Sequence, residues 1–408
     1  MKAVTRDLDP AERVDLVAFA GPDADGPLWL QGDGGLAARG CALRIDLPHG
    51  LADPDAPRRV ADALTTIETH DEVARPATGP VALGALPFDA HAPCHLVVPE
   101  VLVGRNSEGR QWLTTIDGAT ADLPPAPLRP ATPPDGFHLT SPRSHDAFLQ
   151  LVRDAVKAID GGDLEKVVIA REVVVETNRP ITLPSVVERL HALYPSCTVF
   201  SMQGFVGASP ELLVERRGDD VRAFPLAGTF ARSGDAGADA LQAARLQASA
   251  KDRAEHRYVI DELRAALTPR CTDLAVPDQP AIVPLRNVLH LGTEITGRLR
   301  APAASAMELA AALHPTPAVG GTPTAAALQW LADNEPLDRG RYAGPVGWVD
   351  ANGDGSFVVG IRSAEVDAGR RRARLFSGVG IVAGSEPGAE LVETQLKLQA
   401  LLAALVRP

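Results

Sequence analysis

The sequence predicts an α+β fold. Predicted strands occur in runs between long, well-separated helices, whereas an α/β protein alternates strand and helix regularly. The chain has 408 residues, of which 45% are hydrophobic and 23% are charged. A globular chain of this length and composition can form either one large core or two lobes.

The N-terminal third of the sequence predicts strands and turns. Within residues 1–118, short apolar runs such as 81–86 are broken by Gly, Pro and Asp. Residues 119–143 are predicted to be an extended connector, because the seven prolines between positions 123 and 142 exclude a helix. The connector separates this variable N-terminal part from residues 144–408, which carry the patterns that point to chemistry.

The region after the connector opens with a predicted helix. Ser144 is a candidate N-cap, the apolar positions from Phe148 to Ile159 follow the helical period, and a pair of glycines ends the helix. Residues 166–175 then read as a mostly buried strand. A turn at 352–355 is expected to join two later strands. The remaining predicted strands are 198–205, 212–215, 346–349 and 357–363, and the remaining helices are 250–267, 303–313 and 386–405.

Charge and composition exclude several classes of function. The formal net charge of −12 and the pI near 5.3 argue against a nucleic-acid or anionic-membrane surface, since both need clustered Lys and Arg. No run of 18 apolar residues occurs and the first residues contain no apolar segment, so we expect a cytoplasmic protein. Neither a zinc site nor a disulfide framework is expected from four widely separated cysteines, Cys41, Cys94, Cys197 and Cys271.

Lys166 and Glu211 are candidates for a base and acid pair. Lys166 opens a hydrophobic strand, where a lysine is commonly a solvated end or an edge guard. If Lys166 is instead buried, desolvation favours the neutral amine, which can act as a general base. Glu211 follows Pro210 and begins the next strand, so it could be a simple surface carboxylate. In a closed pocket its pKa would rise, and it could donate a proton to a leaving group.

The glycine-rich turn at 377–381 precedes a helix that presents two carboxylates and an ammonium on one face. Glu390, Glu393 and Lys397 fall at i, i+3 and i+7 beside open backbone amides, an arrangement suited to holding an anionic ligand through a hard cation. The simpler alternative is an i,i+4 ion pair on an exposed helix. The same turn also matches the dinucleotide fingerprint G-x-G-x-x-A, but the required acid about twenty residues further on is missing.

Two further acidic stretches, at 249–255 and 350–355, are candidate cation sites. Ser249 and Asp252 resemble a helix-capping arrangement, which offers Asp252 a purely structural role. Glu255 lies one turn further on and could join Glu393 as the second oxygen ligand of Mg²⁺, with substrate and water completing the octahedron. Residues 350–355 imitate the start of an EF-hand loop, but the twelfth position is Ile361 rather than Glu, so calcium binding is not expected.

Nine segments resemble the chorismate-utilising enzymes, in family order over about the last 260 residues. They are EKVVIARE (165–172), GASPELL (207–213), PLAGT (225–229), KDRAEH (251–256), HLGTEITG (290–297), HPTPAVGGTP (314–323), DRGRYAGPVGW (338–348), IRSAE (361–365) and GVGIVAGSEPGAELVET (378–394). The resemblance implies a two-lobed α+β fold, with large antiparallel sheets, helices packed outside them and a Mg²⁺-dependent site between the lobes.

Two positions select a branch of the resembled family. Aminodeoxychorismate synthases carry a nucleophilic lysine in their PIKGT motif, where this chain has Ala227. Anthranilate synthases use ammonia from a glutaminase partner and lack the base lysine, whereas Lys166 is present here. The resemblance therefore implies water as the nucleophile and no glutaminase subunit. HPTPAV followed by GTP, and the PVGWVDANGDG stretch, look most like isochorismate synthases. A salicylate synthase and a non-catalytic chorismate-binding relative remain as alternatives.

The resemblance also implies a role for each site residue. Lys166 would activate water for attack at C2 of chorismate, and Glu211 would protonate the departing C4 hydroxyl. Glu255 and Glu393 would hold Mg²⁺, with Asp252 and Glu390 around the metal. The expected substrate contacts are Gly228, Thr229, His290, Ala318, Val319, Tyr342, Arg362, Gly378, Gly380 and Lys397. For His290, a packed structural role is the alternative. Whether the product would serve menaquinone or siderophore synthesis stays open.

Overall fold

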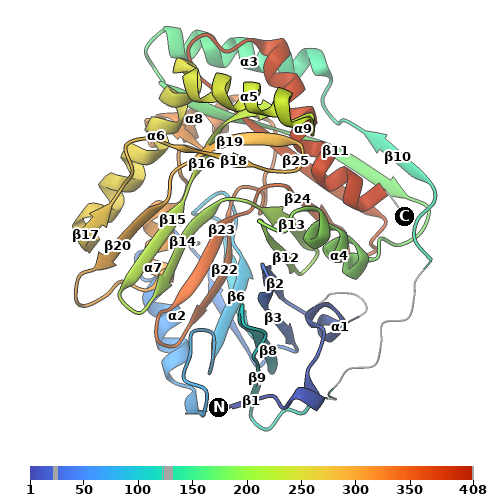
Figure 1. Cartoon of the computed structure of the whole chain (residues 1–408), viewed down its shortest axis with the longest axis vertical. Helices are drawn as coiled ribbons and strands as arrows, with labels where there is room; N and C mark the ends of the chain where they lie inside the picture. Colours follow the sequence, from blue (N-terminus) through green and yellow to red (C-terminus); the bar gives the residue numbers. More distant parts are fainter. Residues whose placement is uncertain (22–25, 122, 124–131, 407–408) are drawn as a thin grey trace.

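The computed structural model describes residues 1–21, 26–121, 123 and 132–406. Two large sheets pack face to face, and most helices lie outside them (Figure 1). The N-terminal strands form the lower part of the view, and the helices of the C-terminal region gather at the top. The prediction of an α+β fold with large antiparallel sheets and outer helices is confirmed. Within the residues described, no helix is long and apolar enough to cross a bilayer.

The larger sheet contains thirteen strands among the described residues, and all of its pairs are antiparallel except β1 with β5. The two-residue strand β21 (Gly321–Thr322) pairs with the start of β11. In spatial order the others are β10 (Phe137–Thr140), β11 (Lys166–Thr177), β25 (Arg372–Ile381), β24 (Ser363–Val366), β13 (Phe205–Ser209), β12 (Thr198–Met202), β2 (Leu28–Gln31), β3 (Gly34–Arg39), β8 (Val101–Arg105), β9 (Gln111–Ile116), β1 (Lys2–Asp7) and β5 (Glu68–Asp71).

The second sheet has nine strands and a third has three, counted over the same residues. The second runs β17 (Cys271–Ala275), β20 (Ile295–Leu299), β15 (Asp220–Phe224), β14 (Leu212–Arg217), β23 (Gly355–Val359), β22 (Pro345–Asp350), β6 (Val81–Ala85), β7 (Cys94–Val98) and β4 (Leu43–Leu47). The third runs β16 (Leu226–Ala231), β19 (Val288–Gly292) and β18 (Ala281–Pro284). N-terminal strands thus pair with C-terminal ones in both large sheets.

The helices are distributed over the outer faces of the sheets. They are α1 (Leu16–Ala20), α2 (Ala56–Thr65), α3 (His145–Asp160), α4 (Leu183–Leu193), α5 (Ala236–Ala248), α6 (Ala250–Leu267), α7 (Ala306–Leu313), α8 (Thr324–Asn334) and α9 (Pro387–Val406), with short 3₁₀ turns at Pro10–Glu12 and Thr268–Arg270. Clusters of buried apolar residues join α2, α6 and α7 to the second sheet, and α1, α4 and α9 to the larger one. A third cluster joins α3 and α8 to β11 and β25.

Side chains from both large sheets fill the space between them. Trp29 and Phe200 of the larger sheet share one buried cluster with Leu83 and Val346 of the second. These residues alternate with outward-facing ones along their strands, as expected for sheets that bury both faces. The sandwich core therefore fixes how the two large sheets lie against each other.

Several elements form where the sequence predicted them. Ser144 caps α3 by accepting a hydrogen bond from the backbone N–H of Ala147 at 3.2 Å, and the apolar side chains of Phe148 and Ile159 are buried. The helix then ends at a glycine pair, of which Gly162 has φ +86°. Helix α6 matches its predicted bounds, and α7 and α9 each lie within three residues of theirs at either end.

Two predicted strands are wrong in extent. The strand expected at 198–205 is a hairpin, because Gln203 and Gly204 both have positive φ, at 50° and 80°, and reverse the chain between β12 and β13. The strand expected at 357–363 breaks after β23, and Arg362 has φ +52° before β24 begins. In both places a left-handed residue inside a mostly apolar run ends the strand.

The predicted connector is only partly described. Residues 122 and 124–131 of it lie outside the described residues. Its last part forms β10, which pairs with the far end of β11 from Phe137 opposite Thr177 to Thr140 opposite Val174. Before it, the strands of residues 1–118 belong to both large sheets, as the pairing of β2 with β12 and of β6 with β22 shows.

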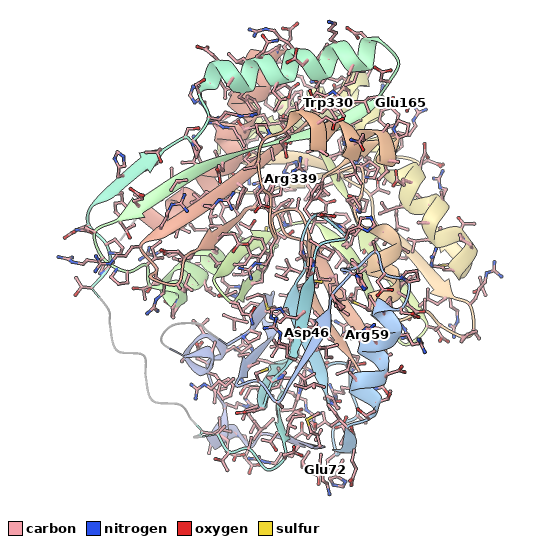
Figure 2. The ribbon with its side chains drawn as sticks, turned by 180° about the vertical axis from the view of Figure 1, so that it is seen from behind. Asp46, Arg59, Glu72, Glu165, Trp330 and Arg339 are labelled. Carbon is pink, nitrogen blue, oxygen red and sulfur yellow. The ribbon has the colours of Figure 1, made fainter. Side chains whose placement is uncertain are left out.

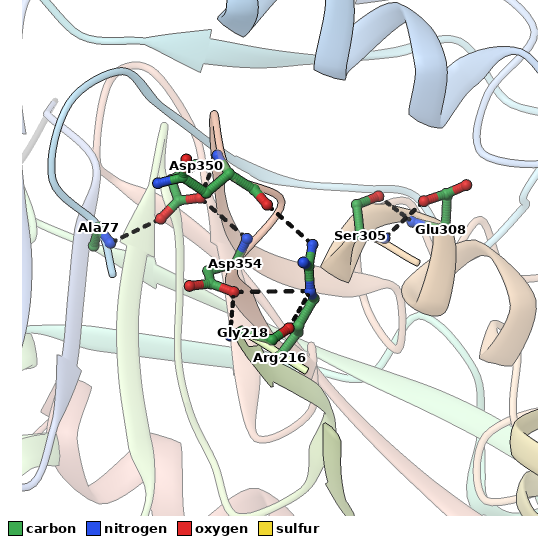
Figure 3. Close-up of polar contacts among 8 residues, drawn as sticks. Ala77, Arg216, Gly218, Ser305, Glu308, Asp350 and Asp354 are labelled. Atoms are coloured by element: carbon green, nitrogen blue, oxygen red, sulfur yellow. Dashed lines mark hydrogen bonds and ion pairs between the residues drawn. The ribbon is translucent and has the colours of Figure 1, made fainter. Parts of the chain in front are cut away.

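The acidic loop that imitates an EF-hand is a structural turn between β22 and β23 (Figure 3). The Asp350 carboxylate accepts backbone N–H groups of Ala77 at 3.1 Å, Asn352 at 2.9 Å and Asp354 at 3.0 Å. Asp354 in turn accepts the N–H of Gly218 at 2.7 Å. Because these carboxylates hold backbone groups of three separate segments, the loop has a structural role.

Candidate active site

A pocket opens where β11 and β25 of the larger sheet face β16 and β19 of the third sheet and the loop at 314–320. The site residues predicted from the sequence that line this pocket are Glu211, Gly228, Thr229, Glu255, His290, Ala318, Val319, Tyr342, Arg362, Gly378, Gly380 and Lys397. The remaining predicted site residues, Lys166, Asp252, Glu390 and Glu393, do not line it, although Lys166, Asp252 and Glu393 contact residues that do. The structure therefore gathers segments from positions 166 to 397 around one cavity.

Lys166 is fully buried, so its interpretation as a solvated strand end is wrong. Its Nζ lies 3.1 Å from Oε1 of Glu255, and its Cε lies beside Gly380. The ion pair lacks the angles of a hydrogen bond, which leaves the ammonium without a hydrogen-bond acceptor among the described residues. A buried donor in this state is costly unless another group, such as water or substrate, completes it.

Glu211 is also buried, with 3% of its surface exposed, so it is not a surface carboxylate. Burial raises its pKa to about 8, although the nearby cations Lys166 and Lys397 oppose the shift. Glu211 is therefore mostly protonated at neutral pH. A protonated carboxyl that lines a pocket can donate its proton, which is the requirement for a general acid.

Three carboxylates around the pocket are each paired with a lysine. Besides Lys166 with Glu255, Nζ of Lys397 lies 2.7 Å from Oε1 of Glu393. Similarly, Nζ of Lys251 lies 2.7 Å from Oε1 of the buried Glu390. Lys397 also donates to the carbonyl of Gly378 at 3.0 Å, so the i,i+4 ion pair forms and still places its ammonium at the pocket.

Asp252 combines a capping contact with a place in this acidic group. The hydroxyl of Ser249 donates to its carboxylate and accepts the Asp252 N–H, so the predicted capping arrangement forms. Burial raises the pKa of Asp252, and the carboxylates of Glu255 and Glu393 add to the shift. The described residues contain no group of three or more His, Cys, Asp or Glu placed to hold a metal.

His290 connects Arg362 to the backbone of β16. Arg362 donates from Nη2 to Nε2 of His290 at 2.9 Å, so Nδ1 carries the proton and donates to the carbonyl of Gly228 at 2.9 Å. Burial, together with the charge of Arg362, holds the pKa of His290 well below its usual value. A neutral imidazole thus orients the guanidinium, and the Thr229 hydroxyl lies 3.3 Å from Nδ1.

Tyr342 lies flat against Phe376, with ring centroids 5.1 Å apart and an interplanar angle of 16°. Burial raises the pKa of Tyr342, so the phenol stays neutral and can donate a hydrogen bond. A Cβ added at Gly378 would lie 2.8 Å from the Tyr342 hydroxyl oxygen. Glycine at 378 therefore makes room for the tyrosine.

Gly380 and Gly228 also allow close approach. A Cβ at Gly380 would overlap Oε1 of Glu255 and lie 3.0 Å from Cε of Lys166. At Gly228, φ is +72° and a Cβ would meet Asp252 at 3.1 Å. Both glycines thus let the acidic side chains of α6 contact the sheets.

The pocket includes residues that the sequence analysis did not predict as substrate contacts. They are Val168, Pro210, Leu226, Ala227, Arg339, Ala343, Ile361, Phe376 and Ser377. Arg339 lies in the segment DRGRYAGPVGW beside Arg341, and the sequence contains no signal that one of these arginines is buried and the other half-exposed. Apolar wall residues resemble any other core residue until the fold brings them together.

The family model of the chorismate binding enzymes matches residues 33–406. The chain belongs to this family. It is 40% identical to MenF of Mycobacterium tuberculosis over 385 residues, which cover 91% of this chain and 99% of that protein. It is 37% identical to the isochorismate synthase DhbC of Bacillus subtilis over 360 residues, 85% of either chain. The resemblance found in the sequence is thereby confirmed.

A solved structure shows the same fold. The present chain superimposes on the structure of MenF, the menaquinone-specific isochorismate synthase from Escherichia coli, with a TM-score of 0.81. The two are 27% identical, and the similarity covers 100% of this chain and 94% of that one. The strands of residues 1–118 are therefore part of the shared architecture.

Replacing Glu211 with Gln should stabilise the protein increasingly as the pH rises. The folded-state pKa of about 8 exceeds the ordinary 4.5, so the native state holds a proton that the unfolded state releases between these values. The free-energy cost of burying Glu211 therefore grows with pH, by roughly 4 kcal/mol between pH 5 and 8. Gln does not ionise, so it has no such cost. Melting temperatures of both proteins from pH 5 to 9 measure this, and a constant difference would contradict the raised pKa.

Replacing Gly380 with Ala should displace Glu255 and Lys166 and lower chorismate turnover at least tenfold, since misplaced reactive groups lose rate steeply. Gly388→Ala is the matched control. A Cβ there meets nothing within 4 Å, and alanine favours helix α9. Steady-state kinetics of the two variants provide the measurement, and equal activity would show that Gly380 is not required for close approach.

Proposed function

We propose that the chain is a Mg²⁺-dependent isochorismate synthase that converts chorismate to isochorismate in the cytoplasm, without a glutaminase subunit. One observation carries the proposal. The buried, protonated carboxyl of Glu211 lines a cavity, and the buried amine of Lys166, which lacks a hydrogen-bond acceptor among the described residues, lies beside the same cavity. The names of DhbC of Bacillus subtilis and MenF of Escherichia coli support the same reaction.

In the proposed reaction, Lys166 and Glu211 transfer protons from and to the oxygen atoms that bond to C2 and leave C4. Lys166 must react as the neutral amine: it accepts a proton from a water molecule whose oxygen bonds to C2, and the ring double bonds shift. The C4–O bond breaks as Glu211 gives its proton to that hydroxyl, which leaves as water. One water enters and one leaves, so the product is an isomer of the substrate and no redox partner is needed.

The remaining side chains bind and orient the substrate. Arg362, held by His290, offers a planar guanidinium that can grip a carboxylate through two hydrogen bonds. The neutral Tyr342 hydroxyl adds a donor beside Gly378, and Lys397 adds positive charge. Ala318 and Val319 are small wall residues next to the expected substrate. These groups match a substrate with two carboxylates.

The carboxylates near the pocket fit a hard cation. Glu255 and Glu393 supply only oxygen donors, and the charges of both contribute to raising the pKa of Asp252, which supports an acidic region at this side of the pocket. With Asp252 and Glu390 beside them, they would hold Mg²⁺ and leave further positions to water and substrate. Bound Mg²⁺ would neutralise this charge and polarise the ring carboxylate of the substrate.

Three alternatives make different demands on the pocket. Covalent attack needs a nucleophile at position 227, where this chain has Ala227. A non-catalytic binding protein needs no acid and base pair. A salicylate synthase would use the same pair and then eliminate pyruvate, whereas the small residues at Ala318 and Val319 favour release of isochorismate.

The purified chain should convert chorismate to isochorismate with Mg²⁺ alone. Chromatography of the products, with and without ammonium, separates this outcome from anthranilate, and salicylate is detected by its fluorescence. Salicylate and pyruvate in equal amounts would replace the proposal with a salicylate synthase. Anthranilate or an aminated isochorismate as the main product would contradict water as the nucleophile.

Replacing Lys166 with Ala, or Glu211 with Gln, should each reduce turnover by about two to four orders of magnitude, because each removes a positioned proton-transfer group. Chorismate affinity should change much less. The exposed Lys157, replaced by Ala, is the control and should leave turnover unchanged. Near-normal turnover of either site variant would remove that residue from its role.

Glu255→Gln and Glu393→Gln should each weaken Mg²⁺ binding, because a cation with few protein ligands loses a charged oxygen. Calorimetric titration of Mg²⁺ in the presence of substrate gives the affinity. Glu386→Gln, an exposed change just before α9, is the control. Unchanged affinity in the Glu393 variant would leave Glu393 as the ion-pair partner of Lys397 alone.

A further inference from the structure

The outer edge of β11 is covered by different partners along its length. On one side β11 pairs continuously with β25, from Val167 to Glu176. On the other side β21 covers its start and β10 covers its end from Val174 onward. No described strand covers the edge between these two partners. Uncovered edge groups inside a protein need other hydrogen-bond partners.

A buried ion pair fills this gap. Arg339 donates from Nη2 to the carbonyl of Val168 at 2.6 Å, and Oε2 of Glu335 accepts the N–H of Ala170 at 2.6 Å. The same two side chains bond each other twice, at 2.7 and 3.0 Å. Beside the bond from the Val168 N–H to the carbonyl of Gly320, the guanidinium and the carboxylate therefore make two of the bonds to β11 that a neighbouring strand would make.

The same arginine holds the loop on the other side of the pocket. Its Nη1 donates to the carbonyl of Val319 at 2.8 Å, and its guanidinium lies over the ring of Phe88, 4.2 Å from the centroid. Figure 2 shows Arg339 near the middle of the molecule, far from Glu72 at its lower end. Val168 and Val319 both line the pocket, so one guanidinium links two of its walls.

We propose that Arg339 and Glu335 are positioning residues for the reaction. The pair takes the place of a strand on β11 and fixes the backbone that follows Lys166 together with the loop that carries Ala318 and Val319. This inference rests on the proposed function only in assigning the reaction to this pocket. The geometry that it requires, two walls joined through one guanidinium, is a property of the protein without substrate.

The chain contains a matched control two residues away. Arg341 bonds Glu365 through two hydrogen bonds, donates to the carbonyls of Met202 and Gln203, and lies over the ring of Phe205 at 5.1 Å. Arg341 thus makes the same kinds of contact as Arg339, but neither Arg341 nor Glu365 lines the pocket. The Arg341 pair is also more exposed, 22% and 21% against 4% and 3%.

The test compares single and double replacements at both pairs. Arg339→Met alone should lower the melting temperature strongly, because it leaves a buried carboxylate unpaired, and Arg339→Met with Glu335→Leu should recover much of that loss. The kcat/KM of the double variant should nevertheless stay about 10- to 100-fold below that of the natural protein, because β11 and the loop that carries Val319 are no longer held in place. Hydrogen exchange at the Ala170 amide should accelerate in both variants.

The control variants should behave differently. Arg341→Met, alone and with Glu365→Leu, should change stability but leave turnover within about threefold and Ala170 exchange unchanged, because this pair neither lines the pocket nor bonds β11. A recovered double variant with natural turnover and natural chorismate affinity would overturn the inference. So would an equal loss of turnover in the control variants.

The outcome is independent of which product the natural protein forms. Chorismate affinity, measured by calorimetry, and exchange at Ala170 are followed in the same variants as the kinetics. If the natural protein forms another product from chorismate, the proposed function fails while the comparison between the two pairs still decides the inference. Unchanged Ala170 exchange in the Arg339 variants would by itself overturn the strand-replacement role.

Discussion

The antiparallel ladder between β11 and β25 is the interaction on which the site depends. It sets Val168 opposite Gly380 and Ala170 opposite Gly378, so two glycines lie where side chains would otherwise fill the cavity. The space they leave is taken by the hydroxyl of Tyr342 and the carboxylate of Glu255. Because side chains alternate along a strand, a shift of one residue in this register would close the pocket.

Charge balance is the second constraint on the pocket. The acidic residues of α6 and α9 would be costly to bury alone, and each buried carboxylate has a lysine or a hydroxyl against it. Glu211 is the exception and solves the same problem by keeping its proton. The pocket thus holds one neutral acid beside several ion pairs, which is the separation of roles that acid and base chemistry requires.

Sequence reasoning reached the elements with strong local signals and the residues within recognised segments. Helix α3 was predictable because its cap, period and terminating glycines are local. The hairpin at Gln203 was not, since a left-handed glutamine in an apolar run carries no distinctive pattern. Burial of Lys166 and Glu211 depends on strands far away in sequence, so the residues alone left both open and the family resemblance favoured the chemical roles. Arg339 was missed because its partners lie on β11 and in the loop that carries Val319.

The pairing of early with late strands has a consequence for how the chain is made. β11 and β25 are about 200 residues apart, so the ladder beside the pocket can close only after β25 has been synthesised, whereas strand pairs such as β1 with β9, β2 with β12 and β12 with β13 can form earlier. During that interval the edge of β11 that later pairs with β25 is open, and β10 covers only the last part of the other edge, a state prone to association with other chains. Production of this protein should therefore benefit from cellular factors that shield this strand edge until β25 has been made.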